Sequence, residues 1–295
     1  MKCFEEWTIA YRKKKDGACL LDDQESPFKT IRNTWRYWCA DPHLIEYHGS
    51  TYVFAELYDR VLRRGVIGYC ELSDSGYTIW KIALKMPWHL SYPHIFMHDE
   101  SVYMIPESYV GNEIAVYKAV SFPDRWEKVR VLKPNCVAVD STLFYNGGNY
   151  WLQTLQLDDS ADSFNLYTIK DGNISEKPHV IARSAVNVRP AGNLFSYKEK
   201  LIRPSQDCSE SYGCALNFYE VTKVAEDDYQ ETLIMKIKPS MILSDFHTVA
   251  QGIHTYNSNE QYEVIDLKEY KSDWLFYIMH PIWAVWRRLK KLFGR

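Results

Sequence analysis

Four carboxylates of this chain stand in similar local patterns. Asp41 in "ADPHL" and Asp140 in "VDSTLF" each open an apolar stretch, whereas Glu107 in "YMIPES" and Asp207 in "RPSQD" each close one. Carboxyl groups that converge can act as a base or nucleophile and as an acid, which is what transfer or hydrolysis of a glycosyl group requires. We predict Asp41 as the nucleophile or base and Glu107 as the acid, with Asp207 the second choice for the acid. Asp140 would orient a partner and tune its pKa through like-charge proximity.

The elements that position these residues repeat along the chain. Similar phrases begin at Asp41, Tyr92, Asp140, Arg189 and His254, and successive starts are 51, 48, 49 and 65 residues apart. Each phrase reads as a strand, a polar turn and a second strand, and further strand-like runs follow before the next start. Sheets of about four strands that recur at this period are typical of a β-propeller. We therefore predict an all-β, five-bladed propeller over residues 1–272.

The propeller prediction assigns a place to two segments that do not fit the regular repeat. The segment "WTIAYRKK" near the N-terminus should supply a strand that closes the ring against the last blade. The longer last interval is assigned to extra residues in "KVAEDDYQET", from Lys223 to Thr232. The alternative is an unrelated β-sandwich in which the phrases resemble one another by chance.

In a propeller, equivalent positions at the starts of the innermost strands converge on the central axis. A carboxylate there costs several kcal/mol unless it is paired or solvated. The repeat starts should therefore form a polar pocket, although a structural ring of ion pairs would use the same residue types. We predict that the pocket binds substrate through six residues: Glu56, Tyr92, Arg189, Arg203, Asp207 and His254.

The composition excludes some classes of protein. The net charge of −3 argues against a nucleic-acid-binding protein, which needs a broad basic face. The seven cysteines are scattered and form no C-x-x-C pair, and the nine histidines lack metal-ligand spacing. We expect no cofactor and assign no metal ligands, although a single cation on the axis stays open. The 22 tyrosines and 10 tryptophans suit both an all-β core and stacking on sugar rings.

Taken as a set, the phrases "ADPHL", "LSYPHIF", "YMIPES", "VDSTLF", "RPAG", "RPSQD", "YG" and "GIHT" carry a family resemblance over residues 35–256. The chain resembles the five-bladed glycosidase superfamily of arabinanases, xylosidases, invertases and levansucrases. It resembles still more the N-terminal domain of plant glucosamine inositolphosphorylceramide transferases. The glycosidase resemblance implies that Asp41 is the nucleophile or base, Asp140 the pKa-modulating residue and His254 the axial histidine of the last blade.

The chain departs from the glycosidases at the fourth repeat, which those enzymes open with the general-acid glutamate. Here Arg189 stands in that place. A phosphate leaving group needs little protonation and favours cations, so Arg189 and Arg203 would clamp an anionic donor. They could equally neutralise nearby aspartates.

We expect a glycosyltransferase with a nucleotide-sugar or sugar-phosphate donor and a glycan or glycolipid acceptor. A hydrolase or phosphorylase with the same carboxylates, or a non-catalytic glycan-binding propeller, are the alternatives.

Residues 273–295 leave the repeat pattern. After Pro281, the apolar residues Ile282, Val285, Trp286, Leu289 and Phe293 share one helical face, and Arg287, Arg288, Lys290 and Lys291 share the other. This pattern is typical of a basic amphipathic helix that lies in a membrane interface and favours anionic lipids. Packing of the helix on the propeller or in a dimer contact is the alternative. Because the N-terminus has charges where a signal peptide needs an apolar run, we expect a cytoplasmic protein peripheral to the inner face of the cell membrane, acting in surface-polysaccharide or glycolipid assembly.

Overall fold

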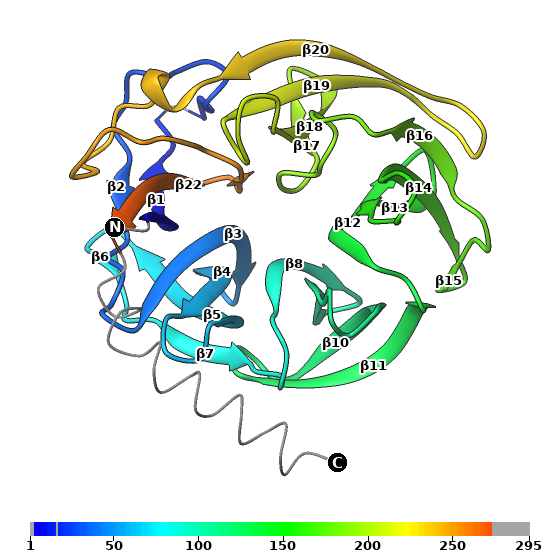
Figure 1. Ribbon diagram of the computed structural model, residues 1–295, viewed down its shortest axis with the longest axis horizontal. Helices are drawn as coiled ribbons and strands as arrows, with labels where there is room; N and C mark the ends of the chain where they lie inside the picture. Colours follow the sequence, from blue (N-terminus) through cyan, green and yellow to red (C-terminus); the bar gives the residue numbers. More distant parts are fainter. Residues whose placement is uncertain (1–2, 16, 273–295) are drawn as a thin grey trace.

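The strands of the chain are arranged as five antiparallel sheets around a central axis, as the computed structural model shows (Figure 1). The structure describes residues 3–15 and 17–272. The predicted five-bladed propeller is therefore confirmed. The predicted C-terminal helix over residues 273–295 lies outside the described residues. Among the described residues there is no helix long and apolar enough to span a bilayer.

The first three blades follow one another along the chain, each with its innermost strand first. Blade 1 contains β3 (Tyr37–Tyr47), β4 (Ser50–Asp59), β5 (Arg64–Ser73), β6 (Gly76–Tyr77) and β7 (Lys81–Leu84). Blade 2 contains β8 (Ser91–His98), β9 (Ser101–Glu107), β10 (Glu113–Ser121) and β11 (Arg125–Pro134). Blade 3 contains β12 (Ala138–Asn146), β13 (Asn149–Gln156), β14 (Ser163–Lys170), β15 (Asn173–Ile174) and β16 (His179–Arg183).

The last two blades include the closure of the ring. Blade 4 contains β17 (Phe195–Tyr197), β18 (Lys200–Asp207), β19 (Ala215–Val224) and β20 (Tyr229–Ile237). Blade 5 contains β21 (Tyr256–Ser258) and β22 (Tyr262–Ser272), followed outward by β1 (Cys3–Lys13) and β2 (Lys29–Thr30). Strand β1 pairs with β22 from Cys3↔Ser272 to Lys13↔Tyr262. The predicted N-terminal closing strand is confirmed, and it ties the two ends of the ring together.

The prediction for the longer last interval was wrong. Residues 223–232 form the end of β19, a hairpin turn and the start of β20, which are ordinary parts of blade 4. The additional length lies in the connection from β20 to β21, residues 238–255, which contains the short 3₁₀ helix η1 (Pro239–Met241).

The repeated polar turns are tight hairpins. His48–Gly49, Asp99–Glu100, Gly147–Gly148 and Lys198–Glu199 join the first two strands of blades 1 to 4, and both central residues of each turn have positive φ. Two-residue turns with this backbone match the twist of the strands they join. The turn signal in the sequence thus identified the inner hairpin of four blades.

The core is divided among the blade interfaces. Five clusters of buried and partly buried apolar side chains each contain residues of two neighbouring blades; for example, Phe54 and Ile67 of blade 1 pack with Ile95 and Met104 of blade 2. Since every sheet is covered on both sides by its neighbours, the blades hold their inner strands at fixed positions around the axis. The polar site is built at one end of these inner strands.

Candidate active site

Asp41, Tyr92 and Asp140 occupy the same structural position in blades 1, 2 and 3. In each blade the first strand carries a β-bulge there: pairing passes from Ala40↔Glu56 to His43↔Phe54, from Ser91↔Glu107 to His94↔Ile105, and from Val139↔Leu155 to Thr142↔Gln153. The three residues have φ of 53°, 39° and 52°. Positive φ is uncommon for residues other than glycine, and a bulge redirects a side chain out of the pleat. The shared register predicted from sequence is therefore present in three blades.

Asp41 is buried in a network that crosses three blades. One of its carboxylate oxygens, Oδ2, accepts a hydrogen bond from the Tyr92 amide at 3.1 Å. The other, Oδ1, accepts one from the Thr255 hydroxyl at 3.1 Å and lies 3.3 Å from His254 Nε2. Burial raises the pKa of Asp41 to about 6, with the Asp140 and Asp266 charges adding to the increase and His254 opposing it. Asp41 thus titrates close to neutral pH, where a general base is most effective.

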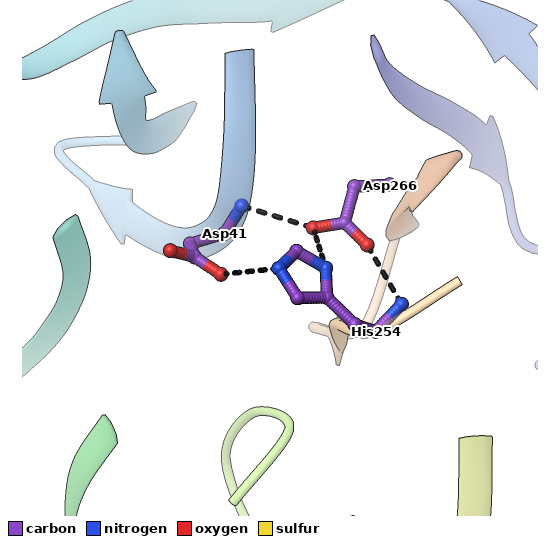
Figure 2. A group of neighbouring side chains, drawn as sticks. All are labelled: Asp41, His254 and Asp266. Carbon is purple, nitrogen blue, oxygen red and sulfur yellow. Dashed lines mark hydrogen bonds and ion pairs between the residues drawn. The ribbon is translucent and has the colours of Figure 1, made fainter. Parts of the chain in front are cut away.

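Asp266 holds both Asp41 and His254 in place, as Figure 2 shows. Its Oδ2 accepts a hydrogen bond from the Asp41 amide at 3.0 Å and lies 2.7 Å from His254 Nδ1. Its Oδ1 accepts the amides of His254 and Thr255 at 3.0 and 2.9 Å. Burial alone would lower the pKa of His254, but the charges of Asp266 and Asp41 raise it above the ordinary value. The two ring nitrogens of His254 thus each lie beside a carboxylate oxygen, Nδ1 beside Asp266 and Nε2 beside Asp41.

These three side chains are also of metal-ligating types, and their ligand atoms lie within 4.8 Å of one another. In the structure they contact each other directly. His254 Nδ1 and Asp266 Oδ2 are 2.7 Å apart, which is the distance of an ion pair. Their relative orientation is not that of a hydrogen bond. The ion-pair network accounts for the arrangement of all three groups.

The second half of the site joins Asp140, Arg189 and Glu107. Arg189 Nε donates a hydrogen bond to Asp140 Oδ2, and its Nη2 lies 3.5 Å from Glu107 Oε2. Asp140 Oδ2 also accepts the Gln206 amide group at 3.0 Å, and the Asp140 backbone amide lies 3.3 Å from Glu107 Oε2. Burial and the Asp140 charge raise the pKa of Glu107 well above its usual range, although Arg189 opposes them. These surroundings favour the protonated form of Glu107, which is the form that a general acid must have.

Arg189 and Tyr212 are partly exposed residues of the site, and we call them its mouth. The Arg189 side chain is 24% exposed, and its guanidinium carbon lies 5.3 Å from the centre of the Tyr212 ring. Tyr212 contacts His254 edge to face at 5.3 Å, and Trp7 of β1 stacks on His254 at 3.8 Å. A guanidinium carries five N–H donors, so Arg189 retains donors beyond those that meet Asp140 and Glu107.

Two other predicted residues lie beside this cluster. Glu56 is buried 3.3 Å from His89, and burial together with the Asp41, Glu107 and Asp140 charges raises its pKa well above the usual range. The Tyr92 ring is fully buried, with its hydroxyl 2.8 Å from Thr142 Oγ1 and from the Gly192 amide that donates to it. The backbone amide of Tyr92 thus donates to Asp41, and its hydroxyl links blade 2 to Thr142 of blade 3 and to Gly192.

Arg203 lies apart from the cluster. Its guanidinium forms a two-pronged ion pair with Glu231, at 2.7 and 2.6 Å, between the rings of Phe164 and Tyr219. The side chain is completely buried. The predicted phosphate clamp of Arg189 with Arg203 is therefore not formed, because Arg203 is committed to the interface of blades 3 and 4.

Asp207 lies apart as well. Its carboxylate accepts hydrogen bonds from Lys236 at 2.7 Å and Ser209 at 2.5 Å. Burial opposes ionisation, but these donors outweigh it and hold the pKa of Asp207 below its usual range. Asp207 cannot supply a proton at neutral pH, so Glu107 is the better candidate for the acid.

Sequence reasoning missed Asp266, Trp7 and Tyr212. Asp266 and Trp7 lie inside strands that pair with each other, and their phrases do not repeat in other blades. The one available signal for Asp266 was a carboxylate in the apolar run "YEVIDL", where burial demands partners. Tyr212 lies on the β18–β19 loop, in the "YG" phrase.

Comparison with known proteins agrees with this architecture. Residues 31–279 match the family model described as glucosamine inositolphosphorylceramide transferase 1, N-terminal. The chain is 34% identical over 206 residues to glucosamine inositolphosphorylceramide transferase 1 of Oryza sativa subsp. indica, and 33% identical over 212 residues to that of Arabidopsis thaliana. These alignments cover 65% of this chain but only 27% and 26% of the relatives, so the chain spans about a quarter of their length.

Solved structures show the same fold at low sequence identity. An α-L-arabinofuranosidase from Podospora anserina, solved with cellotriose, matches 79% of this chain and 91% of its own with a TM-score of 0.59 at 10% identity. The catalytic domain of a Coprinopsis cinerea α-L-arabinofuranosidase matches 78% of this chain and 90% of its own with a TM-score of 0.58 at 11% identity. At this identity the likeness establishes the propeller fold alone.

Proposed function

Because the chain belongs to the glucosamine inositolphosphorylceramide transferase 1 N-terminal family, we propose that it is a carbohydrate-active enzyme that transfers a glycosyl group from an activated donor to a glycan or glycolipid acceptor. One observation carries the proposal. At one end of the axis, the Asp41 carboxylate accepts hydrogen bonds from the Tyr92 amide and the Thr255 hydroxyl, whereas Glu107 lies against Asp140, whose charge adds to burial in raising the pKa of Glu107 well above its usual range. Two carboxyl groups whose surroundings differ in this way can serve as a base and an acid.

The proposed step uses these groups as follows. Asp41 accepts the proton of an acceptor hydroxyl, and that oxygen forms a bond to the anomeric carbon of the donor. The bond from the anomeric carbon to the donor's leaving oxygen breaks, and the oxygen departs with the electron pair. Arg189 stabilises the departing charge where the leaving group is a phosphate, and Glu107 protonates a leaving oxygen that is more basic. Asp266 and His254 fix the orientation of Asp41.

The relatives supply a starting choice of substrates. Their name describes transfer of glucosamine to an inositolphosphorylceramide. This chain spans about a quarter of their length. Glucosamine donors and inositolphosphorylceramide are therefore the first substrates to test on this chain itself.

A ligand screen followed by product analysis tests the function. The protein is heated with nucleotide sugars, sugar phosphates and free oligosaccharides, and a ligand at 100 times its Kd should stabilise it by about 2.7 kcal/mol. A donor that shifts the melting temperature is then incubated with a glycolipid, water or phosphate as acceptor. We expect a glycolipid product. Free sugar or sugar phosphate as the main product would instead identify a hydrolase or phosphorylase, and binding without turnover a glycan-binding module.

The pH dependence of the reaction tests the role of Asp41. A base must be deprotonated, so kcat/KM should rise with pH through an apparent pKa of about 6 in the free enzyme. Asp140→Asn removes a negative charge that raises the pKa of Asp41, and should move this limb to lower pH. A limb near pH 4 in the unmodified protein would contradict the assignment, since that is the ordinary titration range of an exposed carboxyl.

The cellular location is part of the same proposal. The apolar and basic periodicity of residues 282–295 suits attachment to an anionic membrane surface at the cytoplasmic face. The enzyme would encounter a glycolipid acceptor at that membrane surface.

A further inference from the structure

The interface between blades 2 and 3 is less completely filled than the interface between blades 1 and 2. Between blades 1 and 2, the bulky side chains of Trp88, Phe122 and Trp126 pack against the buried cluster. Between blades 2 and 3, the corresponding cluster is covered by smaller side chains such as Leu132 of β11 and Ile169 of β14. A groove of about 640 Å³ remains between these two blades. This volume is typical of a site for a small molecule.

Apolar side chains of both blades form the floor of this groove. Its buried or partly buried lining residues include Phe96, Ile105 and Leu132 of blade 2, and Leu143 and Ile169 of blade 3. Burying apolar surface against them is favourable, whereas a polar group placed there would lose its hydrogen bonds to water. A ligand of the groove must therefore present an apolar face to the floor.

The exposed rim of the groove is polar, and its polar groups come from both blades. Arg130 of β11 donates a hydrogen bond to the carbonyl oxygen of Gly172, on the turn between β14 and β15. Figure 1 shows β15 next to β11 at the outside of the propeller. Gly172 has a φ of 72°, and a Cβ atom there would collide with the guanidinium. A second contact between the blades joins the Tyr150 hydroxyl to His98 Nδ1 at 3.3 Å.

The chemistry of the rim indicates the class of ligand. One guanidinium, from Arg130, and one carboxylate, from Asp171, balance each other, and His98 lies 3.4 Å from Asp99 Oδ2. A ligand with a large net charge would find no excess of opposite charge here. Hydroxyl groups both donate and accept hydrogen bonds, so they suit a rim that offers guanidinium donors, carboxylate acceptors and the phenol of Tyr150. An uncharged sugar has such hydroxyls at its edge and an apolar C–H face.

We propose that the groove between blades 2 and 3 binds a sugar residue of an uncharged oligosaccharide. The C–H face of the sugar packs on the apolar floor, and its hydroxyls meet Arg130, Asp171 and Tyr150. The groove is separate from the candidate active site, because His98 and Tyr92 stand at opposite ends of β8 and only Tyr92 contacts Asp41. A glycan held in the groove therefore leaves the mouth of the site free. The proposal does not rest on glycosyl transfer.

Binding of the full chain to an array of immobilised oligosaccharides tests the groove. The array carries neutral gluco-, galacto-, manno- and xylo-oligosaccharides beside sialylated and sulfated glycans, and we expect binding to neutral ones. Arg130→Ala with Tyr150→Ala should weaken this binding by about tenfold or more, because two hydrogen-bonding groups are lost. The matched control is Arg125→Ala with Tyr109→Ala, which removes the same two side-chain types from exposed positions of blade 2 outside the groove. The control should bind as the unmodified protein does.

Other outcomes overturn the proposal. Failure of the unmodified protein to bind any neutral oligosaccharide on the array would show that the groove is not a glycan site. Equal binding by the groove variant and the unmodified protein would assign the glycan to another part of the chain, and equal loss in both double variants would show a non-specific effect. Binding to sialylated or sulfated glycans alone, lost in the groove variant, would identify an anion site instead. None of these readouts depends on turnover, so failure of the glycan site is distinguishable from failure of the proposed reaction.

Discussion

Asp41→Asn should lower the rate of glycosyl transfer by about 10³-fold, within the range that removal of a positioned general base produces. An amide cannot accept the proton of the acceptor hydroxyl at any pH in the stability range of the protein. The acidic limb near pH 6 should disappear from the residual activity, since the group that titrates there is gone. The measurement is kcat and kcat/KM of the variant against the pH profile of the unmodified protein.

The variant should keep its ability to bind the donor. The carbonyl oxygen of an asparagine can still accept the Tyr92 amide or the Thr255 hydroxyl, which lie 3.1 Å from the two Asp41 oxygens. Donor-induced shifts of the melting temperature therefore separate lost chemistry from lost binding. Loss of both together would instead assign Asp41 to substrate binding or to the integrity of the axis.

Asp207→Asn is the matched control. It makes the same change at a buried aspartate whose carboxylate is held by Lys236 and Ser209. Because Asp207 carries no proton at neutral pH, its replacement should leave the rate of transfer within a few-fold of the unmodified protein. A loss as large as that of Asp41→Asn would restore Asp207 as a candidate for the acid.

The fold could be predicted because its signals are local and repeated. A polar turn between two apolar runs forms the same two-residue hairpin at His48–Gly49 and Gly147–Gly148. The interval between such turns, compared with the length of the chain, gives the number of blades. The convergence of Asp41 and Asp140 follows from their place in the repeat. The wrongly placed extra segment had no such support, because residues 238–255 contain almost no regular structure to mark them.

The partners of each charged group could not be predicted in the same way. Arg189 and Arg203 both stand in "RP" dipeptides, yet Arg189 meets Asp140 at the mouth and Arg203 meets Glu231 inside blade 4. The partner of each arginine depends on the face of the segment from which its side chain projects. The partner carboxylates, Asp140 and Glu231, are also distant in sequence, at 49 and 28 residues. Asp266 was missed for the same reason, since the β21–β22 hairpin brings His254 to it and only closure of the ring brings Asp41.

Arg203 therefore leads to a prediction about stability rather than binding. Glu231→Gln should destabilise the protein by about 3 kcal/mol, near the lower end of what removal of one partner from a buried ion pair costs. The Arg203 guanidinium is fully buried between Phe164 and Tyr219, and a neutral amide leaves its charge uncompensated. At 2–4 °C per kcal/mol, the melting temperature should fall by roughly 6–12 °C.

The neighbouring pair Lys200–Glu220 provides the control. Its side chains are 52% and 25% exposed, so Glu220→Gln should change stability by less than about 0.5 kcal/mol. Arg203→Met with Glu231→Leu should recover much of the loss, because apolar side chains of similar size often replace a buried pair without cost. If Glu231→Gln instead left the melting temperature unchanged and weakened donor binding, Arg203 would belong to the substrate site after all. The geometry argues against that outcome, since a guanidinium with no exposed surface and a two-pronged carboxylate partner has no face left for a phosphate.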